Sequence, residues 1–234
     1  LLVERRGKRF LATEFGKRIS MLYIDPATGI EFRHAVKYAE ERISQLVGLF
    51  HLIAIAPDFT PKLPLRRGDW EEAGLFLEEH KDEFIIPAPE ETGFEIYDDF
   101  IQNFRILMTM WSWIEEVSEE KIRERHGVES GDLHRAVQSA DWLLYALAEV
   151  CKIVGKVSLL KEIDILRRRV KYGVKHELLP LTTLEGVGRV RARALYKAGY
   201  RDLRKLKAAS TQRIAEVEKI GPAVAKKIKE QLSG

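Results

Sequence analysis

Two glycines and three arginines lie close together near the C-terminus of this 234-residue chain: Gly186, Gly188, Arg189, Arg191 and Arg193. Glycines on either side of one apolar residue permit a tight turn, so that the backbone can approach a ligand closely. A helix that begins directly after the turn presents free N–H groups that bind phosphate, and the arginines add positive charge there. This stretch therefore predicts phosphate-binding chemistry.

Residues 181–195, LTTLEGVGRVRARAL, fit the helix-hairpin-helix pattern, in which a small residue, here Ala192, lets two helices cross closely. Shifted by 33 residues, the pattern recurs at Lys219-Ile220-Gly221 and Ala225. A lysine stands where the first glycine should be, and a proline follows the second, so we interpret this copy as degenerate and structural. The doubled pattern predicts a DNA-binding domain over 178–234. The alternative is a hairpin that only packs the tail on the rest of the chain, or that binds protein.

Positive charge is unevenly distributed along the chain, whose formal net charge is +3. Residues 178–234 hold 13 lysines and arginines against five acidic residues, a balance of +8, and residues 1–25 have a balance of +3. The segment between them carries −8. A basic tail on an acidic body favours a polyanionic partner for the tail, although a merely solvated basic face gives the same pattern.

A second candidate site lies on a long helix predicted over 130–154, with Ser130 as its cap. Apolar residues at spacings of three and four form one stripe along it: Leu133, Val137, Ala140, Leu144, Leu147, Cys151 and Val154. A second line points roughly away from this stripe: Arg135, Gln138, Trp142, Tyr145 and Glu149. Trp142 either packs under a second layer of helices or offers its ring, together with Arg135, as a surface for stacking bases. The helix alone leaves both interpretations open.

Other kinds of site find little support in the sequence. The single cysteine, Cys151, excludes intrachain disulfides and cysteine-rich zinc sites, and the six histidines are scattered, so no metal site is predicted. Carboxylate pairs occur at 98–99, 115–116 and 119–120, without a histidine or third acid at a telling spacing, and we interpret them as solvated helix faces. No G-x-x-x-x-G-K-[ST] loop occurs, so we assign no catalytic residue and expect no ATP hydrolysis by this chain.

The N-terminal segment reads as two short strands around a turn at Arg6-Gly7-Lys8, then a helix that Thr13 caps and Asp25-Pro26 ends. Such a hairpin cannot bury a core alone, and the chain opens on Leu1 rather than Met, so we expect a piece of something longer. No signal peptide is recognisable, which favours an intracellular compartment.

Helical patterns cover most of the chain up to residue 177, apart from a turn at 25–29 and a proline-rich loop at 57–68. The predicted helices are residues 30–41, 43–55, 70–81, 94–116, 118–126, 130–154 and 159–172. The apolar run at 46–57 is too short to span a bilayer, so a buried helix is expected there. The predicted fold is all-α, a bundle of about seven helices followed by the small helix-hairpin-helix domain and preceded by a short β-hairpin and helix.

Three stretches closely resemble the C-terminal half of archaeal Hjm-type DNA helicases: FLATEFGKRISMLYIDPATG, GDLHRAVQSADWLLYAL and YGVKHELLPLTTLEGVGRVRARALYKAGY. These are superfamily 2 repair helicases related to the helicase part of DNA polymerase theta, and the resemblance covers essentially the whole chain. It implies that residues 1–25 end a winged-helix domain, 26–177 form a helical ratchet domain and 178–234 form the helix-hairpin-helix domain.

The resemblance also implies roles for the residues singled out above. In the family, an arginine and a tryptophan seven residues apart stack on the bases of the 3′ strand, and they match Arg135 and Trp142. The last domain of the family grips the emerging single strand, and its basic residues match Arg189, Arg191 and Arg193.

From this resemblance we expect the whole protein to be an ATP-dependent 3′–5′ DNA helicase that acts on stalled forks and branched DNA. This chain would supply DNA binding without a cofactor, while ATP and Mg belong to RecA-like motor domains of the same polypeptide. Single-stranded and branched DNA are the expected partners of a cytoplasmic, nucleoid-associated monomer that has no contact with a membrane. The alternatives are the helical unit of an RNA helicase and a protein-interaction scaffold.

Overall fold

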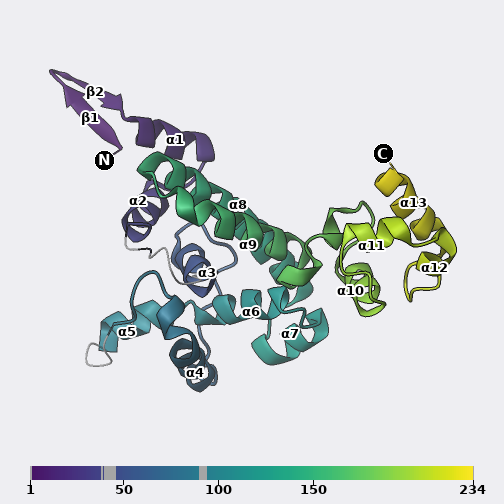
Figure 1. Ribbon diagram of the computed structural model, residues 1–234. Coiled ribbons are helices and arrows are strands. Elements are labelled where there is room, and N and C mark those ends of the chain that lie inside the picture. Colours follow the sequence, from purple (N-terminus) through teal and green to yellow (C-terminus); the bar gives the residue numbers. More distant parts are fainter. Residues whose placement is uncertain (1, 38, 40–45, 90–93, 234) are drawn as a thin grey trace. The chain divides into compact units, whose positions relative to one another are not determined.

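The computed structural model describes residues 2–37, 39, 46–89 and 94–233, and helices make up most of this part of the chain (Figure 1). Its described residues contain one sheet, of two strands. The predicted all-α class is therefore confirmed. Contacts divide the chain into two units, Leu1–Ser112 with Ser118–Lys171 and Trp113–Val117 with Tyr172–Gly234.

The first unit opens with three elements: β1 (Val3–Arg6), β2 (Arg9–Ala12) and α1 (Glu14–Leu22). The two strands pair antiparallel, and Gly7 in the turn between them has a φ of +64°, a conformation that glycine adopts readily. The Thr13 side chain accepts a hydrogen bond from the Gly16 N–H at 3.0 Å, which satisfies a free donor at the start of α1. The predicted hairpin, helix and Thr13 cap are confirmed.

Helix α2 (Pro26–Ala35) begins where the sequence predicts a turn, so the predicted turn at 25–29 is wrong. The Asp25 side chain accepts a hydrogen bond from the Ala27 N–H at 2.7 Å and caps the helix. Proline is favoured at the first helical position, where an N–H has no helical partner anyway, so the Asp-Pro pair starts a helix here. The boundary between the predicted helices 30–41 and 43–55 lies outside the described residues.

The chain continues with five helical elements: α3 (Leu46–Ile55), α4 (Trp70–His80), the 3₁₀ helix η1 (Lys81–Glu83), α5 (Phe94–Ile101) and α6 (Phe104–Ile114). The irregular loop predicted at 57–68 is confirmed. The single helix predicted over 94–116 is wrong, because the chain breaks between α5 and α6. The Gln102 carbonyl accepts a hydrogen bond from the Leu65 N–H of the loop at 3.0 Å, rather than from the next helical turn.

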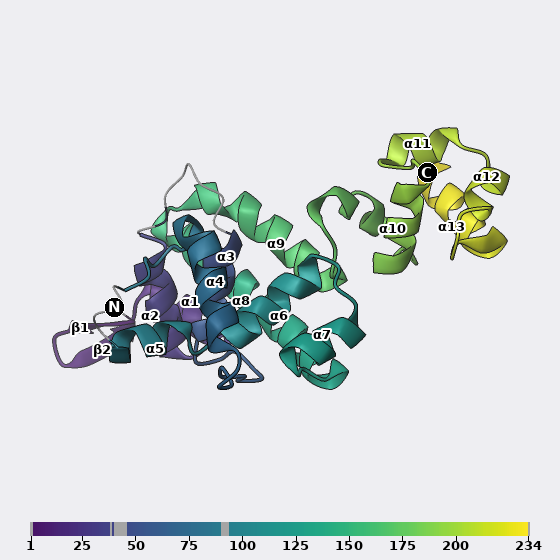
Figure 2. The same cartoon turned by 90° about the horizontal axis from the view of Figure 1, so that it is seen from below.

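Four more elements complete the first unit: α7 (Glu119–His126), α8 (Ser130–Val154), the 3₁₀ helix η2 (Val157–Leu159) and α9 (Leu160–Tyr172). Helix α8 is central to this unit and packs against α1, α2 and α3 (Figures 1 and 2). Most of the predicted apolar stripe is buried, and so are Leu143, Ala146 and Val150, because neighbouring helices cover α8 on more than one side. The predicted cap at Ser130 is wrong, because Ser130 is the first helical residue and Glu129 occupies the cap position.

The second unit contains six short elements: the 3₁₀ helices η3 (His176–Leu178) and η4 (Leu181–Thr183), and α10 (Arg189–Lys197), α11 (Leu203–Ala208), α12 (Thr211–Ala215) and α13 (Gly221–Ser233). Helix α13 packs against α11 and α12. Ala192 and Ala225, the small residues of the two hairpin copies, are both fully buried, as the pattern predicts.

His51 on α3 is enclosed by aromatic rings in the core of the first unit. Its ring centroid lies 5.2 Å from that of Phe84, 4.4 Å from Phe100 and 5.7 Å from Phe104. The Nε2 atom lies 3.2 Å from the Phe100 carbonyl oxygen, while Nδ1 has no hydrogen-bond partner among the residues that the structure describes. Burial lowers the pKa of His51 to about 4, so the folded protein favours the neutral ring.

We expect the first unit to lose stability as the pH falls from about 6.5, the ordinary histidine pKa, toward about 4. The unfolded chain binds a proton on His51 in this range and the folded chain does not, which removes about 3 kcal/mol of stability by the lower end. His51→Leu should therefore flatten the dependence of the melting temperature on pH between 4 and 7. An equally steep dependence in this variant would contradict the assignment.

Candidate nucleic-acid interface

Arg135 and Trp142 both lie on α8, separated by two helical turns, or roughly 10 Å along the helix axis. The Arg135 side chain is 66% exposed and forms an ion pair with Asp132, one turn before it on the same helix. An exposed ion pair of this kind is weak, so the guanidinium group can exchange its partner at little energetic cost.

Trp142 is half-buried, and one edge of its ring is attached to the neighbouring helix. The indole N–H donates a hydrogen bond to the Leu22 carbonyl oxygen at the end of α1, at 3.1 Å. This bond fixes the orientation of the ring while part of its surface stays accessible. Trp142 is therefore neither a fully buried core residue nor a fully exposed stacking surface, the two interpretations that the sequence leaves open.

The remaining members of the line on α8 differ in their surroundings. Tyr145 is 42% exposed, and the Arg167 guanidinium of α9 lies over its ring, 5.2 Å from the centroid. Arg167 also forms two hydrogen bonds to Asp141, at 2.9 and 3.2 Å. The sequence does not predict this contact, because residues 167–169 are all arginines and no pattern tells which of them faces α8.

Glu149 is buried, although the sequence places it in the line that points away from the apolar stripe. It is only 6% exposed, because Arg18 of α1 lies across it at 3.4 Å and Lys152 approaches to 2.6 Å. The exposed side of α8 is therefore interrupted at Glu149, although Lys152, one turn further on, is again 55% exposed.

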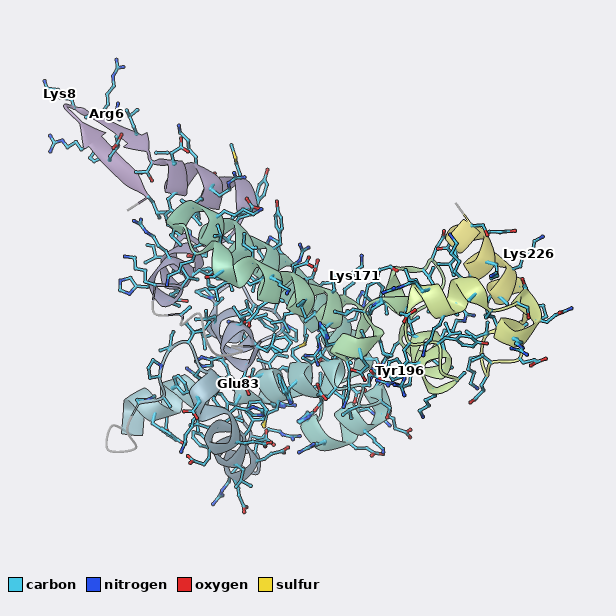
Figure 3. The ribbon with its side chains drawn as sticks, viewed as in Figure 1. Arg6, Lys8, Glu83, Lys171, Tyr196 and Lys226 are labelled. Carbon is cyan, nitrogen blue, oxygen red and sulfur yellow. The ribbon has the colours of Figure 1, made fainter. Side chains whose placement is uncertain are left out.

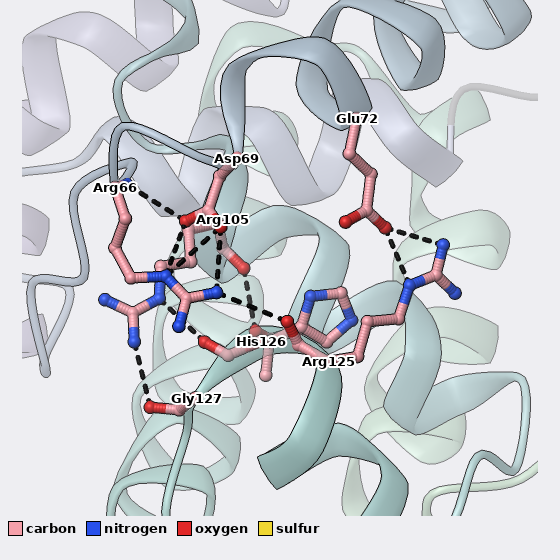
Figure 4. Close-up of polar contacts among 8 residues, drawn as sticks. Arg66, Asp69, Glu72, Arg105, Arg125, His126 and Gly127 are labelled. Atoms are coloured by element: carbon pink, nitrogen blue, oxygen red, sulfur yellow. Dashed lines mark hydrogen bonds and ion pairs between the residues drawn. The ribbon is translucent and has the colours of Figure 1, made fainter.

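Two arginines stabilise the corner between α7 and α8, a role that the sequence does not predict for them (Figure 4). Arg105 donates hydrogen bonds to the carbonyl oxygens of His126 and Gly127, at 2.8 and 2.9 Å. Arg66, which is paired with Asp69, donates to the Arg125 carbonyl at 3.2 Å. Together these bonds satisfy carbonyls at the end of α7 and fix the position at which α8 begins.

Gly127 itself has a φ of +60°, and a Cβ atom there would lie 2.5 Å from Nη1 of Arg66. Only glycine fits this corner without displacing Arg66. The helix predicted over 118–126 does end at residue 126, and the conformation of Gly127 gives the reason.

In the second unit, the first hairpin turn has the conformation that its glycines predict. Gly186 has a φ of +78°, and α10 begins at Arg189, directly after Gly188. The second turn keeps the left-handed conformation at the first position, where a lysine replaces the glycine, but differs at the second position, since Gly188 has a φ of −85°. Lys219 has a φ of +65° and Gly221 one of +64°.

All three arginines of the first hairpin have partners within the second unit. The Arg189 guanidinium donates to the Val117 carbonyl at 2.7 Å and lies 4.7 Å from the centroid of the Trp113 ring. Arg191 donates to the Gly186 carbonyl at 2.7 Å and to the Lys219 carbonyl at 3.1 Å.

Arg193 forms the strongest set of contacts, with two carboxylates. It donates two hydrogen bonds of 2.7 Å to Glu116 and one of 2.8 Å to Glu177. Burial alone would raise the pKa of Glu116, but the hydrogen bonds from Arg193 and from the Lys175 N–H hold it below its usual value. The interpretation of 115–116 as a solvated face is therefore wrong for Glu116, whose side chain is only 13% exposed.

The described ranges contain neither a cluster of metal-ligand side chains nor a helix that could span a membrane. No three His, Cys, Asp or Glu side chains come together there as a metal ion would require. None of the helices within these ranges is both long and apolar enough to cross a bilayer.

Taken together, the fold is that of an all-α protein in which a helical unit with one long central helix is joined to a tandem helix-hairpin-helix unit. The chain belongs to the family described as "Archaeal helicase, domain 4", which matches residues 47–173, more than half of its length. Residues 178–233 match the "SAM-like Helix-hairpin-helix tandem" family. The family resemblance recognised in the sequence is confirmed.

Several relatives share the name "ATP-dependent DNA helicase Hel308". The chain is 37% identical over 210 residues to that of Pyrococcus abyssi, which covers 89% of this chain and 28% of the relative. It is 35% identical to that of Methanocella arvoryzae over 99% of this chain and 31% of the relative. It is 38% identical to that of Thermococcus kodakarensis over 91% of this chain and 19% of the relative. The chain thus spans less than a third of the length of these relatives.

Proposed function

We propose that this chain is the DNA-binding C-terminal region of an ATP-dependent 3′–5′ DNA helicase that acts on stalled forks and branched DNA. Its membership in the archaeal helicase domain 4 family carries the proposal, and the names of its Hel308 relatives support it. ATP and Mg would bind to RecA-like motor domains in the same polypeptide, because this chain contains no G-x-x-x-x-G-K-[ST] loop.

Within this proposal, residues 26–177 form the ratchet domain and 178–234 the helix-hairpin-helix domain, after the end of a winged-helix domain at 1–25. Arg135 and Trp142 would stack on bases of the single strand. The exposure of Arg135 and the fixed, partly accessible ring of Trp142 are compatible with such stacking.

The helix-hairpin-helix domain would hold the DNA backbone without regard to sequence. The turn at Gly186 and Gly188 places the start of α10, where N–H groups can bind a phosphate, next to a residue without a side-chain cap. Direct phosphate contact by Arg189, Arg191 and Arg193 is part of the prediction from family resemblance. Each of them would have to leave its present partner to make such a contact.

The proposal extends to the setting of the protein. It acts as a monomer in the cytoplasm, associated with the nucleoid, and has no membrane partner. An RNA helicase unit and a protein-interaction scaffold are the competing functions, and nucleic-acid binding experiments separate them.

The purified chain should bind a single-stranded DNA oligonucleotide in preference to RNA of the same sequence, and it should not hydrolyse ATP. Binding is measured by fluorescence anisotropy with unlabelled RNA as competitor, and hydrolysis by phosphate release with and without DNA. Preference for RNA would favour the RNA helicase unit, and absence of binding to both would favour the scaffold. ATP turnover stimulated by DNA would contradict the assignment of the motor to other domains.

A further inference from the structure

The two hairpin copies in the second unit share a left-handed residue at the first position of their turns, but they differ in the side chains at corresponding positions. The offset of 33 residues places Lys219 at the position of Gly186, and Lys226 at the position of Arg193. Gly186 and Lys219, which correspond in the two copies, both have a left-handed backbone. The second copy therefore keeps the first position of the hairpin turn, and it has lysines where the first copy has a glycine and an arginine.

The arginines of the first copy are directed at protein groups. Arg193 would have to give up three hydrogen bonds to two carboxylates before it could bind a phosphate, and its side chain is only 24% exposed. Arg191 joins the two turns, because its donors reach the Gly186 and Lys219 carbonyls at the same position in each copy. These contacts hold the unit together.

The lysines of the second copy are much freer. The Lys219 side chain is 61% exposed, and its ammonium nitrogen lies 3.5 Å from the carboxylate of Glu218, which is 81% exposed. Lys226 on α13 (labelled in Figure 3) is 77% exposed and lies 3.9 Å from Glu230. Long, exposed ion pairs of this kind contribute little, so neither lysine loses much when it turns to another anion.

We propose that the second hairpin, through Lys219 and Lys226, contacts the phosphates of single-stranded DNA, whereas the arginines of the first hairpin hold the two turns in place. The proposal rests on the DNA-binding function proposed above. An ammonium group binds a phosphate oxygen as a point charge and reads no base, which suits a grip that is independent of sequence. It reverses the interpretation of the second copy as purely structural.

The test uses the whole chain and a fluorescently labelled oligothymidylate of about 20 nucleotides, titrated at several KCl concentrations. Replacing both lysines, Lys219→Gln with Lys226→Gln, should reduce the slope of log K against log salt by about 1.4, or roughly 0.7 for each lost phosphate contact. For affinities that converge near 1 M salt, this corresponds to binding about 25-fold weaker at 0.1 M. The substitutions are exposed, and a thermal melt checks that the fold is kept.

Two matched controls separate a specific contact from loss of charge. Lys219→Arg with Lys226→Arg keeps the charge and should keep the slope. Arg204→Gln with Lys207→Gln removes two exposed charges from α11 instead, and should change the slope by clearly less than 1.4.

A slope unchanged by the two lysine-to-glutamine substitutions would overturn the assignment to the second hairpin, as would an equal effect of the α11 control. In both cases the unaltered chain still binds, so DNA binding itself would stand. If the unaltered chain does not bind oligothymidylate at low salt, the proposed function fails, and this inference fails with it.

Discussion

Trp142→Ala is expected to weaken the binding of single-stranded DNA by about 1–3 kcal/mol, or roughly 5- to 150-fold, the range for the loss of one base–aromatic stack. The ring is held at one edge by the bond from its N–H to the Leu22 carbonyl, so it is already oriented before DNA binds. Arg135→Ala should act in the same direction. The two effects need not add, because both residues would contact the same strand.

The same variant also tests whether Trp142 is a core residue. Truncation of a fully buried tryptophan costs about 3–5 kcal/mol of stability. Trp142 is only half-buried, so the free energy of unfolding should fall by less, about 1–2 kcal/mol for the lost hydrogen bond and partial packing. A thermal melt and a DNA titration on the same sample give both quantities.

Two further variants make the test of the stacking surface sharper. Trp142→Phe keeps an aromatic face but loses the N–H, and should retain most of the binding. Gln138→Ala lies one turn before Trp142 on the exposed side of α8 and should change the affinity little. A large drop in melting temperature with unchanged affinity in Trp142→Ala would assign the ring to the core.

Arg193→Ala is expected to lower the free energy of unfolding of the second unit by about 2–3 kcal/mol, since it leaves the carboxylate of Glu116 largely buried without its partner. For a unit of this size, the melting temperature should fall by roughly 10–20 °C. The double replacement Glu116→Gln with Arg193→Gln removes both charges and should recover part of this loss.

Hydrogen exchange of amides in α10 and α13 follows this unit separately from the first. Arg204→Ala, which truncates an exposed arginine on α11, is the control and should leave exchange nearly unchanged. Exchange in Arg193→Ala that matches the unaltered protein would show that the contacts to Glu116 and Glu177 contribute little.

Much of the fold follows from local signals in the sequence. The caps at Thr13 and Gly127, the apolar stripe of the helix at 130–154 and the two hairpin copies depend on neighbouring residues, and the structure confirms them. The break at Gln102 could not be predicted, because it depends on a hydrogen bond from Leu65, which is distant in sequence.

The partners of charged residues were the least predictable part of the candidate site. A run of alternating arginines indicates positive charge, but not whether the charge faces solvent or a carboxylate from another segment. Glu116 and Arg193 are 77 residues apart, and no periodicity connects them. For the same reason, no local pattern indicates that Arg66 and Arg105 hold the start of α8.

The salt dependence of single-stranded DNA binding by the unaltered chain tests the central claim most directly. Labelled oligonucleotides of two unrelated sequences are titrated from about 0.05 to 0.5 M KCl, a range over which phosphate contacts weaken binding steeply. The account predicts tight binding at low salt, a negative slope of roughly 0.7 per phosphate contact in the logarithmic plot, and nearly equal affinities for the two sequences. Binding that is absent at low salt, or that does not change with salt, would contradict it.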